Sequence, residues 1–415
     1  MTHQIAVTIR APLKTGRSPE VAALLDALRK DVDHDGGPFS GMPGLHFARV
    51  FVLPGDTDLD VPDTLVYLAE VDAPLRAHLD DMLDQDRLTA LFAQCADYPE
   101  RGPHGGRVRW ASRHRVEPAA WYVHRVGRSA QQVRDEARLR AAVVDFLDRG
   151  GWPDGTPANT VHSAVQEFVA SRPDLAWALT PAAFPGPLFR AREALHALGG
   201  AAALLALSPL LLPVLPGWLL LVRRHERRDV PETARPSREH VAALTAGEDH
   251  GTPNPFTAYG RVKPGLVRGV TIRVALRGLD YAARHVFARD NLAGIRSIHF
   301  ARWVLLDGGR RVVFASNYDG SQESYMSDFI DRVAWGVNLV FSNGVGYPST
   351  RWLLFGGARD EQRYKAYLRN HQLPSVWFSA YPTLSARNVD DNSALREGLA
   401  GPLTEEGARR WLSLV

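Results

Sequence analysis

The pattern of apolar and polar positions predicts the same series of elements near each end of the chain. Alternating or continuously apolar runs predict strands, and apolar residues at helical spacing predict helices. Near the N-terminus the predicted strands are 5–9, 45–53, 64–71 and 121–126, with helices at 19–32 and 75–95. Near the C-terminus the predicted strands are 257–262, 297–306, 311–316 and 351–356, with helices at 267–287 and 324–341. Both series read β-α-β-β-α-β, so we expect an α+β protein.

The sequence itself repeats within these two series. Residues 44–49, Gly-Leu-His-Phe-Ala-Arg, reappear at 297–302 as Ser-Ile-His-Phe-Ala-Arg. Residues 65–72 align without a gap on 312–319, and each copy then runs through a helical stretch to a Tyr-Pro pair. The separation is far longer than the period of a solenoid. The repeat therefore predicts two copies of one domain in a single chain.

Each series matches the ferredoxin-like split unit. One such unit leaves a face of its sheet uncovered, because both helices protect the other face. Two sheets packed face to face would bury both open faces, so we expect an intrachain pair of ferredoxin-like units. The predicted organisation is a first repeat at 1–150, a linker at 151–250, and a second repeat with a C-terminal extension at 251–415.

The predicted linker contains an apolar segment, 198–222, that has no charged residue. It is long enough to cross a bilayer, which takes roughly 20 apolar residues. Arginines stand on both sides of it, and Pro209, Pro213 and Pro216 are expected to break a helix in the middle. A single crossing would place the two copies on opposite sides of the membrane, where they could not pack together. We therefore favour a hairpin that enters the bilayer from the cytoplasmic side, over a true crossing or a buried helical pair.

Composition narrows the classes of function. The chain has 49 basic and 46 acidic residues, a net charge of +3, and its arginines are spread along the sequence. This balance argues against a nucleic-acid partner, although the arginines beside the apolar segment could attract anionic lipid. The single cysteine, Cys95, excludes an intrachain disulfide and any site built from paired cysteines. The N-terminus does not have the pattern of a signal peptide.

Candidate chemistry concentrates in the second copy. His299 and Arg302 lie three residues apart in a predicted strand, so their side chains should point to opposite faces unless a bulge intervenes. His46 and Arg49 recur at the matching positions of the first copy, which favours a shared structural role. A buried arginine needs a partner, and we expect the aspartate of the same copy, Asp319 for Arg302, to supply it.

The turn at 316–321, Ser-Asn-Tyr-Asp-Gly-Ser, is richer in polar residues than its counterpart in the first copy. Asn317 and Asp319 are therefore candidates for a ligand site in or beside the second copy. The structural alternative is a helix cap, since Asp319 or Ser321 would precede a helix that begins near residue 323. Further along, His371 follows a predicted helix at 362–368 and could either cap its end or reach a cofactor.

Three motifs of the second copy resemble those of an uncharacterised bacterial family with tandem ferredoxin-like repeats. They are His-Phe-Ala-Arg-Trp at 299–303, Ser-Asn-Tyr-Asp-Gly-Ser at 316–321, and Trp-Phe-Ser-Ala-Tyr-Pro at 377–382. The tandem arrangement is similar to the dimeric α/β-barrel superfamily, and more distantly to dye-decolorizing peroxidases and chlorite dismutases. The peroxidase pattern Gly-x-x-Asp-Gly is similar to residues 316–320, with Ser316 in place of the first glycine. This resemblance implies a haem cofactor.

Two hypotheses of different class follow. The first is a membrane-associated oxidoreductase, haem-dependent and peroxidase-like, that acts on an apolar or lipid-derived substrate. In that hypothesis Asp319, Arg302 and Asn317 are catalytic, and His299 or His371 binds the haem iron. The alternative is a non-catalytic, membrane-bound module that binds a lipid or a protein. The sequence shows no nucleophile elbow, phosphate-binding loop, dinucleotide fingerprint or zinc pattern, which argues against hydrolase, kinase and nicotinamide-enzyme functions.

Overall fold

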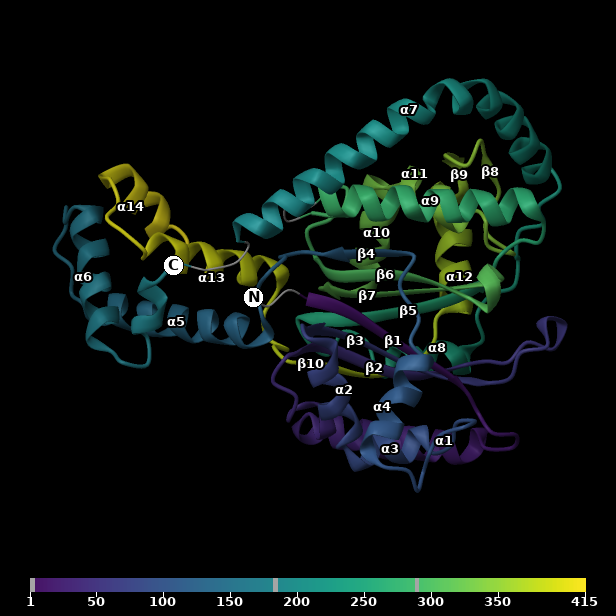
Figure 1. Ribbon diagram of the computed structural model, residues 1–415. Coiled ribbons are helices and arrows are strands. Elements are labelled where there is room, and N and C mark those ends of the chain that lie inside the picture. Colours follow the sequence, from purple (N-terminus) through teal and green to yellow (C-terminus); the bar gives the residue numbers. More distant parts are fainter. Residues whose placement is uncertain (1–3, 182–185, 288–290) are drawn as a thin grey trace.

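A computed structural model describes residues 4–181, 186–287 and 291–415 (Figure 1). The protein is α+β, and within these residues it contains two four-stranded antiparallel sheets with helices on their outer sides. The strand orders are β1-β3-β2-β10 and β4-β6-β7-β5. The α+β class expected from the sequence is therefore confirmed.

The first sheet is built mainly from the N-terminal copy. Its three long strands are β1 (Gln4–Pro12), β2 (Leu45–Leu53) and β3 (Thr64–Asp72), close to the predicted ranges. Its helices are α1 (Ser18–Asp35), α2 (Leu75–Leu83), α3 (Asp86–Phe92) and α4 (His104–Arg113). The predicted helix at 75–95 is thus two helices that meet at a short non-helical join. A buried cluster that includes Leu28, Tyr67, Leu88 and Trp110 joins these helices to the sheet.

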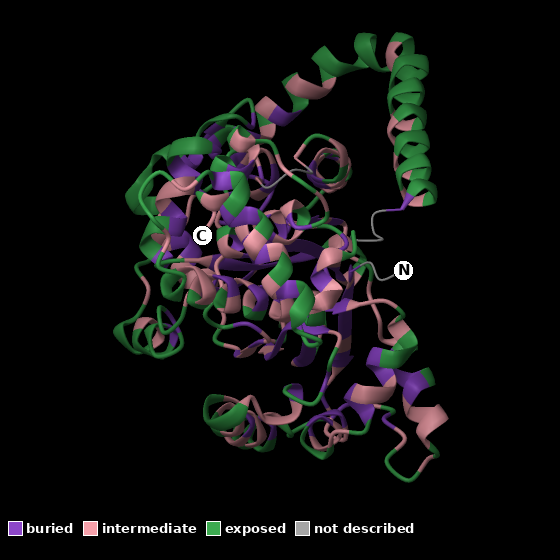
Figure 2. Ribbon diagram, turned by 90° about the vertical axis from the view of Figure 1, so that its left-hand side faces the viewer, coloured by how far each residue is buried: buried purple, intermediate pink, exposed green. Residues whose placement is uncertain are grey.

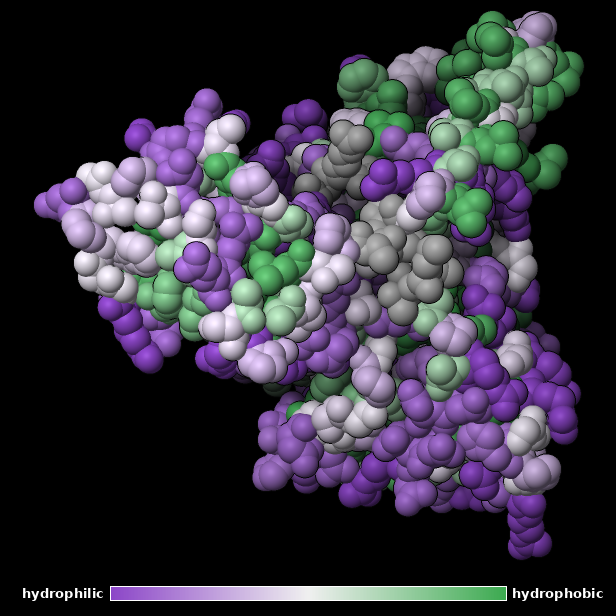
Figure 3. All heavy atoms as spheres, turned by 60° about the vertical axis from the view of Figure 1, so that its left-hand side comes forward, coloured by the Kyte–Doolittle hydropathy of each residue, from purple (hydrophilic) through white to green (hydrophobic). Residues whose placement is uncertain are grey.

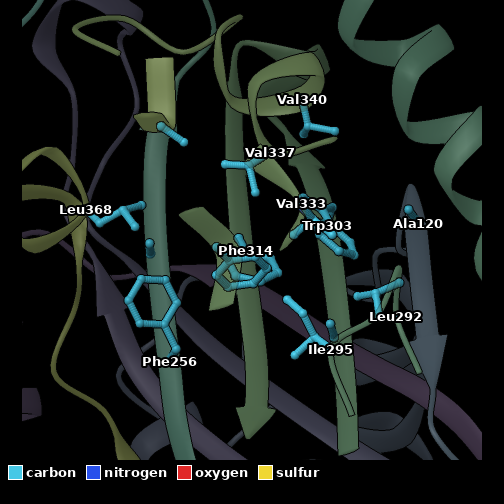
Figure 4. Close-up of a cluster of buried hydrophobic side chains, with 14 of the residues drawn as sticks. Ala120, Phe256, Leu292, Ile295, Trp303, Phe314, Val333, Val337, Val340 and Leu368 are labelled. Carbon is cyan, nitrogen blue, oxygen red and sulfur yellow. The ribbon is translucent and has the colours of Figure 1, made fainter. Parts of the chain in front are cut away.

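The second sheet repeats this plan with the C-terminal copy. Its long strands are β5 (Pro253–Arg261), β6 (Ile298–Leu306) and β7 (Arg311–Asp319). Its helices are α9 (Leu266–His285), α10 (Gln322–Arg332), α11 (Ala334–Phe341) and α12 (Glu361–His371). Aromatic side chains such as Phe256, Trp303 and Phe314 fill the core between this sheet and its helices (Figure 4).

Each copy gives its fourth strand to the other sheet. Strand β4 (Ala120–Val123) follows the first copy but pairs with β6, and β10 (Val376–Ser379) follows the second copy but pairs with β2. Figure 4 shows Ala120 of β4 beside the strand that carries Trp303. The prediction that each copy completes its own sheet is therefore wrong. Residues 351–356, predicted as the fourth strand of the second copy, instead form a small hairpin of β8 (Thr350–Arg351) and β9 (Phe355–Gly356).

The inner faces of the two sheets share one buried cluster. Alternate residues of β2 and β3 meet alternate residues of β6 and β7, because successive side chains of a strand point to opposite faces. The members are Phe51, Leu53, Val66, Leu68, Val304, Leu306, Val313 and Ala315. None of these side chains is more than 3 % exposed, so the contact between the sheets excludes water.

A helical lobe stands beside the two sheets and also mixes distant parts of the chain. It consists of α5 (Ala130–Arg149), α6 (Ala158–Ser171), α13 (Ala386–Gly398) and α14 (Glu405–Leu412). Helix α5 packs on α13 and α6 packs on α14, with Leu139, Val165, Leu395 and Trp411 in the shared core. The helices that begin this lobe, α5 and α13, directly follow the exchanged strands β4 and β10, so the exchange also positions the lobe.

Helix α7 (Pro187–Glu226) contains the apolar segment, and α8 (Arg238–Thr245) follows it. Helix α7 is continuous for 40 residues, with Pro209, Pro213 and Pro216 inside it. The expectation that the prolines break it into a hairpin is therefore wrong. Instead the helix curves into an arch that leaves the rest of the molecule and returns to it (Figure 1). The curvature is consistent with proline, which removes a backbone hydrogen bond and bends a helix without always ending it.

Both halves of the arch are fixed to α9. The hydroxyl of Tyr281 donates to the carbonyl oxygen of Ala197 at 2.7 Å, and Nε1 of Trp218 donates to Oγ1 of Thr271 at 3.1 Å. A straight helix of this length would extend about 60 Å, twice the length of α9. The curvature is what allows both contacts. Between them α7 is almost entirely exposed (Figure 2), and its leucines form an apolar protrusion (Figure 3).

Candidate functional site

A β-bulge sets the direction of each repeated histidine. The pairing of β6 with β7 shifts between Ile298 and Phe300, and the pairing of β2 with β3 shifts between Leu45 and Phe47. His299 and His46 are therefore the extra residues of two matching bulges. A bulge re-aims the side chains that follow it. As a result His299 and Arg302, which a regular strand would place on opposite faces, both lie on the inner side of their sheet.

Each of these histidines is held by an aspartate that also binds the start of a helix. Nε2 of His299 lies 2.6 Å from Oδ1 of Asp319, and the other carboxylate oxygen accepts the amide of Ala386 at 2.7 Å. In the first copy Asp72 makes the same pair of contacts, with His46 at 3.1 Å and the amide of Ala130 at 3.0 Å. A carboxylate is favourable at the first turn of a helix, because the free amides and the helix dipole are both positive there.

The cap at the turn after β7 is Ser321, whose side chain accepts the amide of Ser324. The prediction of a cap is thus confirmed for Ser321. Asp319 does not cap this nearby helix; it binds the first turn of α13, 67 residues further along the chain. No local pattern indicates this contact, because the partner is brought in by the exchanged strand β10.

Arg302 crosses from the second sheet to the first. Its guanidinium donates to the carbonyl oxygens of Val7 and Ala69, at 2.7 and 2.6 Å. It also pairs with the carboxylate of Glu70 at 2.6 Å, and both side chains are at most 5 % exposed. The predicted partner within its own copy, Asp319, is therefore wrong.

Arg49 makes the mirror contact from the first sheet to the second. It donates to the carbonyl oxygens of Phe256 and Ser316, each at 2.8 Å. Where Arg302 meets Glu70, Arg49 meets the neutral side-chain oxygen of Asn317. Burial, and after it the charge of Arg302, lower the pKa of Arg49 to about 9, while the charge of Glu70 opposes the shift. Asn317 thus serves the contact between sheets, and it also accepts Nε1 of Trp377 at 3.0 Å.

A small cavity lies where the two copies meet, beside the bulged histidines. It is lined by Gln4, His46, His124, Arg125, Arg128, Val133, His299, Phe300, Tyr381 and Val389. The hydroxyl of Tyr381 lies 2.9 Å from Nδ1 of His46, and Nε2 of His124 lies 2.7 Å from Oδ2 of Asp390. Three histidines, each paired with a carboxylate, therefore surround one space. Burial raises the pKa of Tyr381 well above its ordinary value, so its hydroxyl keeps its proton at neutral pH.

The sequence predictions missed His124 and Tyr381 as members of this site. Trp121 and Trp377 stand at matching positions eight residues before the helix-capping residues Ser129 and Ser385. Extending the repeat past the two Tyr-Pro pairs would have aligned these segments. His124, directly after β4, and Tyr381, two residues after β10, could then have been recognised as residues that follow equivalent strands.

His371 lies apart from the other predicted residues. It is the last residue of α12, and its Nδ1 is 2.8 Å from the carbonyl oxygen of Tyr367, within the last turn. It lines a different cavity, beside Tyr259 and Gly260. The structure therefore brings His299, Asn317 and Asp319 together, along with the backbone of Arg302. His371 lies elsewhere.

The cavities beside the predicted haem ligands are small. The cavity beside His299 has a volume of about 20 Å³, and so does the cavity beside His371. Such a volume holds about one water molecule. Nε2 of His299 is already bound to Asp319. Among the described residues, no group of three or more histidine, cysteine, aspartate or glutamate side chains has the geometry to bind a metal ion. The haem hypothesis stays a prediction.

In comparison with known proteins, no protein-family model matches the sequence, and no curated protein matches it.

Proposed function

We propose that the protein is a non-catalytic, membrane-bound module whose arched helix α7 enters a bilayer from one side. The observation that carries the proposal is the exposure of this helix. It is the one helix among the described residues that is long and apolar enough to cross a membrane. Only 6 % of its most apolar stretch is buried. An exposed apolar surface of this extent marks an interaction site.

The contacts at the two ends of α7 favour entry from one side over a crossing. Glu193, near its start, binds Arg284 of α9 at 2.5 Å. Glu226, its last residue, binds the β8–β9 hairpin of the same half of the molecule. A helix that spans a bilayer would have its ends on opposite surfaces, about 30 Å apart across the hydrocarbon. Arg190 and Arg192 before the segment, and Arg223 and Arg224 after it, suit the cytoplasmic leaflet.

The predicted catalytic residues support a binding role. Arg302 and Asn317 take part in buried contacts between the sheets, and Asp319 joins a histidine to a helix. The same contacts recur in the first copy, where they involve Arg49 and Asp72. A contact that recurs in both copies is explained by a role in stability. We also propose that each half is a ferredoxin-like unit, and that the exchanged strands close the pair into an intrachain dimeric α/β barrel.

Vesicle flotation tests the proposal. The full chain should float with vesicles of phosphatidylcholine and phosphatidylglycerol, and a variant in which residues 200–216 are replaced by a Gly-Ser linker should remain in the aqueous fraction. Protease digestion of sealed vesicles should cut sites in both halves from the same side. Cleavage of only one half, with the other protected inside, would overturn entry from one side.

The peroxidase-like oxidoreductase remains a second candidate, because three histidine–carboxylate pairs surround one cavity. Its test is the visible absorption spectrum of the purified protein. A Soret band that is lost in His299→Ala but retained in His46→Ala would favour it over the binding module. A haem-free protein that still binds vesicles would leave the binding module as the supported function.

A further inference from the structure

A second apolar surface lies beside α7, on the β8–β9 hairpin. The hairpin turns through Trp352, Leu353 and Leu354, and three of its apolar side chains face solvent. Trp352 is 37 % exposed, Leu354 38 % and Phe355 53 %. The hairpin points toward the inner side of the α7 arch (Figure 1). Large apolar side chains gathered at the tip of a polar body are uncommon on a surface that faces only water.

The backbone of this tip is strained. Trp352 has φ of 59° and Leu353 has φ of 62°, both in the left-handed region that glycine normally occupies. For bulky residues such a conformation is unfavourable, because the Cβ atom crowds the neighbouring backbone. Two in succession therefore need a fixed partner to hold them.

That partner is Glu226, the last residue of α7. Its carboxylate accepts the amides of Trp352 and Leu353, each at 2.8 Å, and the hydroxyl of Thr350 at 2.9 Å. The side chain of Glu226 is completely buried, and Arg223 balances its charge at 3.0 Å. The end of the apolar helix therefore dictates the conformation of the hairpin tip, and the two apolar surfaces are held in one fixed relation.

The surroundings of the tip match the boundary between hydrocarbon and headgroups. The guanidinium of Arg351 lies over the ring of Phe355 at 5.6 Å, and Arg224, Arg227 and Arg228 are exposed at the end of α7. Trp335, 51 % exposed, begins α11, which packs beside β9. Tryptophan and arginine together are typical of the membrane–water interface, where rings lie among headgroups and cations bind anionic lipid.

We propose that the tip of the β8–β9 hairpin is a second membrane-inserting element, positioned by Glu226 to enter the same leaflet of an anionic bilayer as α7. The inference rests on the proposed membrane binding and adds a specific contact to it. The bilayer is favoured over a protein partner because the tip is continuous with α7, whose segment 198–222 carries no charged residue with which a protein surface could form an ion pair. The arginine rim supplies the preference for anionic lipid.

Site-specific fluorescence tests the proposal and separates it from membrane binding in general. Cys95 is fully buried, so an environment-sensitive thiol label on the folded chain will report only an added cysteine. We would label Phe355→Cys at the tip, Leu211→Cys on α7, and Ala22→Cys on α1 as the control. Vesicles of phosphatidylcholine and phosphatidylglycerol in equal parts should shift the emission of the first two labels to the blue and leave the third unchanged.

Each of the other outcomes overturns the hairpin proposal, either alone or together with the proposed function. A response at position 211 without one at 355 overturns the hairpin proposal and leaves the proposed function intact. No response at either position, with the chain remaining in the aqueous fraction, overturns both. A shift at 355 that follows protein concentration without vesicles would show a second copy as the occupant, and would also overturn the proposal.

Two further variants measure the contribution of the tip. Replacing Trp352, Leu354 and Phe355 together by serine should reduce the vesicle partition coefficient by about tenfold, because binding scales with the apolar area inserted. Val126→Ser, at an exposed valine on another part of the molecule, is the matched control and should leave partition unchanged. Equal partition of the triple variant and the wild-type chain would contradict the proposal.

Glu226→Gln tests the positioning role. It removes the charge from the partner of the strained tip, so the amides of Trp352 and Leu353 should exchange hydrogen faster, and the label at 355 should respond less to vesicles. Glu239→Gln, at an exposed glutamate of α8, is the control. Unchanged exchange and an unchanged response in Glu226→Gln would remove Glu226 from the proposal. The label in the otherwise wild-type chain still tests insertion if Glu226→Gln does not fold.

Discussion

The two copies hold each other by the same contact made in opposite directions, yet only one of the two contacts contains a counter-charge. Arg302 of the second copy and Arg49 of the first each donate to two backbone carbonyls and one threonine hydroxyl of the opposite sheet. Arg302 also meets the carboxylate of Glu70, whereas Arg49 meets the amide of Asn317. At this pair of contacts two guanidinium groups therefore share one carboxylate.

The difference shows which part of the contact geometry depends on charge. Backbone carbonyls are fixed by the strands and can satisfy a guanidinium wherever it enters, so the arrangement survives the loss of one carboxylate. The loss of the carboxylate changes the electrostatic environment of the arginine. The pKa of Arg49 falls to about 9 because burial and the nearby charge of Arg302 both disfavour the cation, and the carboxylate of Glu70 opposes this shift. Glu70 therefore serves both arginines.

The largest expected effect is that of removing this shared carboxylate. Glu70→Gln leaves two buried cations without a counter-charge, and breaking a buried ion pair costs about 3–5 kcal/mol. We expect the free energy of unfolding in urea to fall by this amount. The double variant Glu70→Gln with Asn317→Asp moves the carboxylate from Arg302 to Arg49 and should recover most of the loss. A single variant that costs less than about 1 kcal/mol would contradict the shared role, since exposed pairs contribute no more than that.

The two arginines should differ when each is replaced by methionine. Arg302→Met leaves the carboxylate of Glu70 buried without its direct partner, at a cost of about 3–5 kcal/mol. Arg49→Met leaves only neutral acceptors unpaired, at about 1–3 kcal/mol. Urea unfolding of the two variants under the same conditions measures the difference. Equal losses would mean that Glu70 interacts with both arginines to the same extent, and that the asymmetry of the contact has no energetic consequence.

The aspartates at the bulges should behave alike in the two copies. Asp72→Asn and Asp319→Asn each remove a negative charge from the start of a helix, where it contributes up to about 2 kcal/mol when partly buried. We expect each to lower stability by about 1–2 kcal/mol in thermal or urea unfolding. If Asp319→Asn is as stable as the wild-type chain while an oxidase or peroxidase activity of the protein is lost, Asp319 is catalytic and the structural interpretation fails.

The smallest expected effect concerns a contact that only the second copy has. Nδ1 of His196 on α7 lies 2.7 Å from Nε2 of His285 on α9, so at least one ring must be neutral. Burial and the neighbouring His196 lower the pKa of His285. Because the pKa of His285 is lower in the folded state, the stability that this contact contributes is complete above the unfolded-state pKa of about 6.5. That stability is lost as the pH falls through the lower folded-state pKa.

The protection of backbone amides in the turn around His196, corrected for the intrinsic pH dependence of hydrogen exchange, should therefore be lower at pH 5.5 than at pH 7.5. The same comparison in α1 of the first copy, which carries no such contact, supplies the control. His285→Gln, which cannot take a proton, should remove the pH dependence. Protection of the turn around His196 that is independent of pH would show that the histidine contact does not hold the arch to α9.

Much of the fold could be predicted from the sequence, because it follows from local patterns. The long strands of both copies and the helix positions were found within a few residues, since apolar periodicity is a property of the segment itself. The repeat Gly44–Arg49 and Ser297–Arg302 marked the bulged strands correctly, and the condition that a bulge would unite His299 and Arg302 on one face was met. Ser321 was found as a cap because its partner, Ser324, is three residues away.

The errors involve partners that are distant in the chain. Arg302 was assigned to Asp319, but its partner Glu70 is 232 residues away. The three prolines were expected to break α7, and the helix instead continues through them. In each case the local pattern allowed two outcomes, and packing against another part of the molecule selected one.

The sequence by itself determined that two copies of one strand-and-helix pattern stand in this chain, with a charge-free apolar segment between them. These features depend on the order of residues and on the periods of helix and strand, which are local. Only the tertiary structure decided that β4 and β10 change sheets, that each arginine serves the opposite copy, and that both ends of α7 return to the same face. The physical reason is that a strand edge offers the same backbone hydrogen bonds to any partner, so nothing within the segment specifies which sheet it will join.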